Sequence, residues 1–286
     1  MRVALIINPA SGAIRDPADI VALLRSAGAT EVRSFALGEE EAAARSGADR
    51  MVVAGGDGTI GPSALAAADG GVPLAVLPAG TANDFARALG LPLDLEQAAR
   101  VALSPTPTTR PVEVCVTADG RPFVNAANAG LAVRAAREAR GLKARLGPLA
   151  YGLGAVRAGL RAPAIEVDVT LDGRPFFSGA AWQVAVSGTG HFGGGSAVGD
   201  TDPDDGLLDV TVVPAGARIA LARRAYGMRR GTLDAQHDVP HARARTARVH
   251  MATDAEGRGF NVDGELVKVA ALEAHVHPRR AEVLVP

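Results

Sequence analysis

A short glycine-rich segment, Gly55-Gly56-Asp57-Gly58-Thr59, follows directly on the apolar run at residues 51–54. Glycine permits positive φ and leaves no Cβ between backbone amides and a ligand, so such a turn can hold a phosphate with its N–H groups. Asp57 would repel a bare phosphate, but a divalent cation prefers oxygen ligands and can bridge a carboxylate to phosphates. The segment therefore indicates a nucleotide phosphate site that needs a metal, with an ordinary strand-to-helix turn as the alternative.

A second polar loop, at residues 78–87, adds another carboxylate. Thr81 and Asn83 are candidates to cap the helix that is predicted to begin in this loop. The same helix N-terminus would attract a phosphate group. Asp84 would lie near Asp57 if the strands that precede the two loops are neighbours in a sheet.

Two further acidic groups lie in the second half of the chain. Residues 200–209 contain five aspartates, and close carboxylates repel one another unless a cation or solvent separates them. A magnesium or calcium site that uses Asp202, Asp205 and a backbone carbonyl is one interpretation, and a solvated acidic loop is the other. Asp263-Gly264 is a hairpin turn signal, and Glu265 beside it is either a turn residue or a general base aimed at a hydroxyl.

The elements that must position these residues alternate over the first hundred positions. Apolar runs predict strands at residues 3–7, 30–35, 51–54 and 73–77, and helical spacing predicts helices at 17–27, 39–45, 60–68 and 83–88. This alternation favours a parallel sheet flanked by helices, in which ligands bind beyond the carboxyl ends of the strands. We expect the polar turns at residues 8–12, 55–59 and 78–84 to converge there.

The pattern changes at residues 104–109, a proline-containing polar stretch that predicts a linker. Strands dominate beyond it, at residues 111–117, 122–128, 164–171, 176–187, 207–213, 246–251, 259–263 and 266–276. We therefore predict an α/β protein with an N-terminal Rossmann-like parallel-sheet domain and a C-terminal antiparallel β-sandwich domain. The first covers residues 1–108, with 280–286 as a candidate to return to it, and the second covers 109–279.

The β-rich domain has a basic helical insertion at about residues 132–161. Residues 133–161 contain seven Arg or Lys against one Glu, with an uncharged apolar stretch at 146–153. A basic amphipathic segment suits an anionic membrane surface, and a solvated arginine face is the alternative.

Bulk composition excludes several classes of protein. The net charge of −1 over 286 residues gives no overall attraction for nucleic acid, and aromatic residues are only 3%. The single cysteine, Cys115, excludes an internal disulfide and fits a reducing compartment. No segment reaches the ~18 uncharged apolar residues of a membrane span. We expect a cytoplasmic protein that makes transient contact with an anionic membrane surface. The sequence does not decide between a monomer and a homodimer.

Six motifs in this order resemble the diacylglycerol kinase catalytic domain family, in its bacterial soluble lipid kinase branch, which shares its nucleotide-binding plan with the NAD kinases. The motifs are Asn8–Gly12, Gly55–Thr59, Gly80–Ala86, Leu146–Tyr151, Asp205–Asp209 and Asp263–Glu265. Together they extend over nearly the whole chain. The resemblance implies ATP-dependent phosphorylation of a lipid hydroxyl, with diacylglycerol as the default acceptor and with ATP and magnesium as cofactors.

The resemblance also implies roles for individual residues. Asp57 and Asp84 would organise the catalytic magnesium through water, and Glu265 would take the proton of the lipid hydroxyl with Asp263 beside it. Nucleotide binding would involve Asn8, Pro9, Ser11, Gly55, Gly56, Gly58, Thr59, Gly80, Thr81, Asn83 and Glu265. The metal ligands would include Glu113, where the family often has an aspartate, and a structural magnesium site formed by Asp202, Asp205 and the carbonyl of Leu207.

Three alternatives stand beside this interpretation. The chain could be a kinase for another lipid alcohol, such as a sphingoid base, or a non-catalytic lipid- or nucleotide-binding relative. A Rossmann-type oxidoreductase is disfavoured because no G-x-G-x-x-G follows the first strand.

Overall fold

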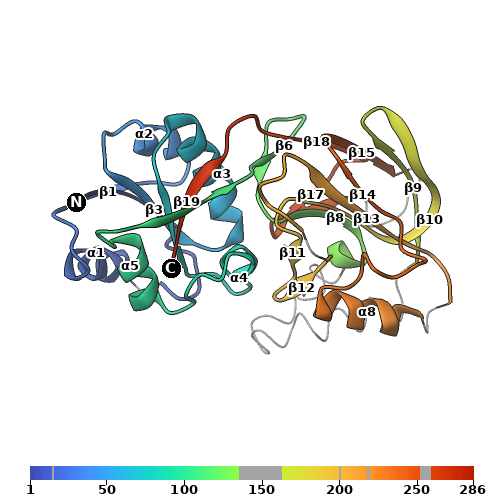
Figure 1. Ribbon diagram of the computed structural model, residues 1–286, viewed down its shortest axis with the longest axis horizontal. Helices are drawn as coiled ribbons and strands as arrows, with labels where there is room; N and C mark the ends of the chain where they lie inside the picture. The colour runs from blue at the N-terminus through green and yellow to red at the C-terminus, as the bar shows by residue number, and fades with distance from the viewer. Residues whose placement is uncertain (15, 135–162, 200, 218–219, 252–258) are drawn as a thin grey trace. The chain divides into compact units, whose positions relative to one another are not determined.

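The computed structural model describes residues 1–14, 16–134, 163–199, 201–217, 220–251 and 259–286. The chain forms two compact units (Figure 1). The first comprises Met1–Val114, Pro122–Val124 and His277–Pro286, and the second comprises Cys115–Arg121 and Asn125–Val276. The expected basic insertion lies almost entirely outside the described residues. Within them, no helix combines the length and the apolar character that crossing a membrane requires.

The first unit contains a six-stranded sheet with the order β2-β1-β3-β4-β19-β5. Its strands are β1 (Arg2–Ile7), β2 (Glu31–Phe35), β3 (Arg50–Gly55), β4 (Leu74–Pro78), β5 (Thr108–Val112) and β19 (Ala281–Val285). All neighbours are parallel except β5, which pairs antiparallel with β19 at the edge. Every residue of β3 and β4 is buried, as expected of parallel strands that are covered on both faces. The predicted parallel-sheet architecture is confirmed.

Helices cover both faces of this sheet (Figure 1). They are α1 (Pro17–Ser26), α2 (Glu40–Ala44), α3 (Asp57–Gly70), α4 (Asp84–Ala88) and α5 (Leu95–Ala102). Strand alternation places Leu5, Val52 and Leu77 in one core with residues of α1 and α5. The helices α2 and α3 contact the sheet through β1, β3 and β19. The helices pack against the sheet and hold the carboxyl ends of β1, β3 and β4 in place.

Some local predictions for the first unit were wrong. The helix α5 was not predicted, although Asp94 marks its start by accepting a hydrogen bond from the backbone N of Gln97 at 2.9 Å. Thr108 and Thr109, assigned to a linker, belong to β5. The strand predicted at 111–117 is divided between β5 and β6 (Cys115–Thr117), with an interruption at residues 113–114.

The second unit is built on antiparallel strands in the order β17-β16-β8-β10-β9-β15-β18-β6, and β13 pairs with β10 and with β14. Their bounds are β8 (Ala126–Gly130), β9 (Ile165–Leu171), β10 (Arg174–Ser187), β13 (Leu208–Pro214), β14 (His241–Ala244), β15 (Thr246–Met251), β16 (Phe260–Val262), β17 (Glu265–Val267) and β18 (Ala271–Val276). The first half of β10 pairs with β9, and its second half pairs with β8 and β13. This long strand joins the two parts of the sheet and confirms the predicted antiparallel, sandwich-like architecture.

The remaining described elements are short or helical. They are β7 (Pro122–Phe123), β11 (His191–Phe192), β12 (Ser196–Ala197) and the helix α8 (Ala220–Arg230). Two predicted strands are interrupted: residues 122–128 form β7 and β8, and residues 266–276 contain parts of β17 and β18. The helix α8 was not predicted.

Candidate active site

The three polar loops of the first unit lie together at the carboxyl ends of β1, β3 and β4. The backbone N of Asn8 donates to the carbonyl of Ala54 at 3.0 Å, and Ala79 donates to the carbonyl of Gly55 at 2.9 Å. Asn8 Nδ2 also donates to Thr59 Oγ1 at 3.2 Å. Because these bonds join neighbouring loops, the convergence expected from the strand order is confirmed.

Two of the glycines allow the backbones of these loops to approach closely. A Cβ placed on Gly80 would lie 2.6 Å from the Cα of Gly56, and one placed on Gly56 would lie 3.2 Å from the Cα of Gly80. A Cβ on Gly55 would lie 2.7 Å from Thr59 Oγ1. None of the three has a positive φ. The positive-φ explanation was therefore wrong here, and the absence of a Cβ is what the fold requires.

The two carboxylates expected to bind magnesium begin successive helices. Asp57 is the first residue of α3, and Asp84, only 4% exposed, is the first residue of α4. Asp57 Oδ1 accepts a hydrogen bond of 3.0 Å from the backbone N of Phe85, the residue that follows Asp84. The two loops that carry these carboxylates are thus directly joined, and the helix N-termini favour their negative charge.

The polar residues beside them have different surroundings. Asn83 has a left-handed backbone, with φ of 50°, and its side-chain amide closes a turn by bonding both the N and the O of Gly80, at 2.9 and 3.1 Å. It makes no capping hydrogen bond to α4, so the capping interpretation of Asn83 was wrong. Thr81 and Pro9 are exposed, whereas Ser11 and Thr59 are buried. Thr59 therefore joins the loops together through its contact with Asn8.

Glu113 lies in the first unit with a buried side chain. Its Oε1 is 3.9 Å from Arg280 Nη2, so the arginine that precedes β19 neutralises part of its charge. Among the described residues, no three His, Cys, Asp or Glu side chains gather as a metal site. The Asp57 and Asp84 pair fits a hydrated magnesium ion, since Mg²⁺ commonly keeps several waters and uses one or two carboxylates.

The predicted hairpin turn of the second unit is confirmed between β16 and β17. Asp263 and Gly264 both have positive φ, at 43° and 92°, which is the geometry of the tight hairpin turn that Asp-Gly favours. Asp263 Oδ1 accepts hydrogen bonds from the backbone N of Asn125 and of Ala126, each at 3.0 Å. Asp263 therefore anchors the hairpin to the start of β8.

Glu265, in contrast, has an exposed side chain. Its Oε2 is 3.0 Å from Arg121 Nη1, and 61% of the side chain is accessible to solvent. Glu265 can therefore meet a substrate hydroxyl, with its charge balanced by Arg121. Arg121 was missed from the sequence because it lies 144 positions before Glu265, and no local signal connects the two.

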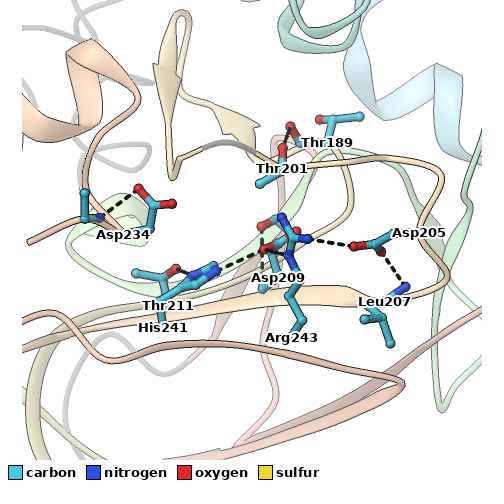
Figure 2. A network of polar contacts seen from close by, with 11 residues as sticks. Thr189, Thr201, Asp205, Leu207, Asp209, Thr211, Asp234, His241 and Arg243 are labelled. Atoms are coloured by element: carbon cyan, nitrogen blue, oxygen red, sulfur yellow. Dashed lines mark hydrogen bonds and ion pairs between the residues drawn. The ribbon is translucent and has the colours of Figure 1, made fainter.

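In the structure, the cation that contacts the acidic segment at residues 202–209 is the guanidinium of Arg243 (Figure 2). Asp205 Oδ1 accepts a hydrogen bond from the backbone N of Leu207 at 2.9 Å, and Oδ2 lies 3.1 Å from Arg243 Nη1. Asp202 Oδ1 accepts from the backbone N of Asp204 at 3.2 Å. Burial raises the pKa of the Asp205 carboxyl above its ordinary value, and the facing Asp209 raises the pKa of Arg243. Asp205 thus contacts Leu207 N and Arg243 through its two oxygens, at the position where the resemblance implied magnesium.

The fold of this chain is similar to the folds of two groups of kinases. The fold is similar to that of an NAD kinase from Archaeoglobus fulgidus, with a TM-score of 0.54 and 15% identity over 100% of this chain and 94% of that one. It is more similar to a diacylglycerol kinase from Bacillus anthracis str. Sterne, with a TM-score of 0.76 and 25% identity over 100% of this chain and 97% of that one. The fold is thus that of the NAD kinase and diacylglycerol kinase class.

Family models match both units in sequence. Residues 2–116 match the diacylglycerol kinase catalytic domain, and residues 125–285 match the YegS C-terminal NAD kinase beta sandwich-like domain. A relative named "Diacylglycerol kinase" from Bacillus subtilis (strain 168) is 31% identical, covering 76% of this chain and 71% of its own. A "Probable lipid kinase YegS-like" protein from Pseudomonas aeruginosa (strain UCBPP-PA14) is 34% identical, covering 86% and 80%. The chain belongs to the family of diacylglycerol kinases and YegS-like lipid kinases, and it is a phosphotransferase.

Proposed function

We propose that this protein transfers the γ-phosphoryl group of ATP to the hydroxyl of a lipid alcohol, with diacylglycerol as the default acceptor. The observation that carries the proposal is the hydrogen bond from Phe85 N to Asp57, which joins the loops of Asp57 and Asp84 at neighbouring strand ends. Phosphoryl transfer depends on positioning and on charge neutralisation. Two carboxylates beside backbone loops suit that need, because they would hold a divalent cation whose charge offsets that of the phosphates.

Each group has a separate role in the proposed reaction. The loops that begin at Asn8, Gly56 and Gly80 would bind the nucleotide phosphates. Asp57 and Asp84 would hold a hydrated magnesium ion, which would neutralise the charge of the phosphates. Glu265 accepts the proton of the lipid hydroxyl as its oxygen forms a bond to the γ-phosphorus, and ADP leaves with the electrons of the broken P–O bond. Asp263 positions Glu265 by fixing the hairpin to β8.

A transfer assay with labelled ATP tests this function. Purified protein is offered diacylglycerol, a sphingoid base and other lipid alcohols, with and without magnesium. We expect magnesium-dependent transfer to diacylglycerol. Transfer only to another lipid alcohol would show that the acceptor is not diacylglycerol, while the protein would still be a lipid kinase. ATP binding without transfer to any lipid would favour a non-catalytic relative of the family.

The variant Asp57→Asn identifies the role of the carboxylate. An asparagine oxygen can still accept the hydrogen bond from Phe85 N, so the variant removes the charge and leaves that contact in place. We expect transfer to fall by about 10²-fold or more, the usual effect of losing one stabilising group at the transferring centre. The matched control is Asp19→Asn, an exposed aspartate in the first turn of α1. Unchanged transfer in Asp57→Asn would remove this carboxylate from the reaction.

We also propose transient contact with an anionic membrane surface. The segment 133–161 suggested it, and α8 supports it within the described residues: Tyr226 is 63% exposed, and Arg229 and Arg230 beside it are exposed as well. Each arginine near an anionic surface contributes about 1 kcal/mol, or roughly a fivefold gain in binding. Sedimentation with phosphatidylglycerol vesicles should show binding that weakens with salt and with Arg229→Ala plus Arg230→Ala. Arg25→Ala on α1 is the control, and binding insensitive to both changes would contradict the proposal.

A further inference from the structure

The acidic segment 202–209 lies beside a strand pair that presents a basic side chain to it. In the pairing of β13 with β14, Asp209 is directly opposite Arg243, and Thr211 is directly opposite His241. Because side chains alternate along strands, these four residues share one face of the pair. The Asp209 side chain is 0% exposed, so its charge needs a partner within the protein.

Arg243 supplies that partner and reaches the acidic loop at the same time (Figure 2). Its Nε donates to Asp209 Oδ1 at 3.1 Å, and its Nη1 lies 3.1 Å from Asp205 Oδ2. His241 Nε2 is 3.2 Å from the same oxygen of Asp209, and its Nδ1 is 2.9 Å from Thr211 Oγ1. One planar guanidinium therefore joins a carboxylate of the loop to a carboxylate of the strand, which its fork of donors suits.

A magnesium ion at the same carboxylates would compete with these contacts. Mg²⁺ requires oxygen ligands at about 2.0–2.1 Å in octahedral geometry. The ion would have to share Asp205 oxygens that already contact Arg243 and the amide of Leu207, and it would stand beside a fixed positive charge that repels it. The contacts of Asp205 with Arg243 and with Leu207 N already hold the loop in the position that such an ion would otherwise fix.

We propose that the guanidinium of Arg243 takes the place of a structural cation in this chain and holds residues 202–207 against β13. The acidic loop then folds without a bound metal. This role concerns the folding of the second unit, so it does not depend on which lipid the protein phosphorylates.

Thermal unfolding with and without divalent cations tests the proposal. The wild-type protein, Arg243→Ala and the control Arg245→Ala, an exposed arginine two positions along, are each measured in chelator and in millimolar Mg²⁺ or Ca²⁺. We expect no rise of the wild-type Tm in cation that Asp205→Asn would abolish. In Arg243→Ala the Tm falls by about 5–15 °C, because a buried carboxylate loses its partner, and the control changes little. Added cation should restore part of the loss, since it can replace the positive charge that Arg243 brings to Asp205 and Asp209.

A second variant separates this site from other cation sites. In Arg243→Ala combined with Asp205→Asn, the recovery with cation should disappear. The proposal would be overturned if Mg²⁺ raised the Tm of the wild-type protein but not the Tm of Asp205→Asn. The loop would then bind metal with Arg243 present. The wild-type comparison decides the question even if Arg243→Ala does not fold.

Discussion

The contact between Gly56 and Gly80 leads to a graded prediction about nucleotide binding. A Cβ at position 80 would lie 2.6 Å from the Cα of Gly56, whereas ordinary van der Waals contact is 3.4–4 Å. The two backbones must therefore separate by about 0.8 Å or more in Gly80→Ala. A Cβ at position 56 would lie 3.2 Å away, so Gly56→Ala requires only a few tenths of an ångström.

These displacements act on the loops that we propose to hold the ATP phosphates. A misplacement of about 1 Å can cost roughly 10²-fold in rate, and overpacking costs about 1–3 kcal/mol of stability. We therefore expect ATP affinity and transfer to fall strongly in Gly80→Ala, less in Gly56→Ala, and not in the control Gly216→Ala. Gly216 is exposed, with nothing within 4 Å of its ideal Cβ.

Calorimetric titration of a non-hydrolysable ATP analogue, the transfer rate and urea unfolding are measured for all three variants. Unfolding curves separate a loss of folded protein from a displaced loop. Wild-type affinity and rate in Gly80→Ala would refute the reasoning, and so would a larger loss in Gly56→Ala than in Gly80→Ala.

Two further predictions concern the second unit. Glu265→Gln should lower the rate of transfer by about 10²–10⁴-fold and keep the affinity for ATP, because only the proton acceptor is lost; an equal loss of both would assign Glu265 a structural role. Hydrogen bonding from Arg224 holds the pKa of Asp238 well below its ordinary 3.8. The contact between Arg224 and Asp238 therefore stabilises the folded protein above pH 3.8, and this stabilisation is lost as the pH falls below 3.8 toward the lowered pKa. Urea midpoints of Asp238→Asn should therefore depend less on pH below about 4 than those of the wild-type protein, and parallel acid profiles would contradict this assignment.

In the first unit, the residue pattern alone predicted β1 to β4, α1 to α4 and the loops between them. Short apolar runs followed by glycine turns define β1, β3 and β4, because strands buried on both faces carry little but apolar residues. Alternation with helices then requires parallel neighbours, whose carboxyl ends lie at one edge of the sheet. The hairpin at Asp263-Gly264 was equally local, because two consecutive positive φ values need those residue types.

The contacts that require particular residues at the site became visible only in the folded chain. Gly56 and Gly80 are required by the approach of two loops 24 positions apart, and no backbone angle at either residue reveals it. Arg121 meets Glu265 across 144 positions, and Arg243 meets Asp205 and Asp209 through the pairing of β13 with β14. Such contacts depend on strand order and register, which are set by the packing of the whole sheet and not by the residues on either side.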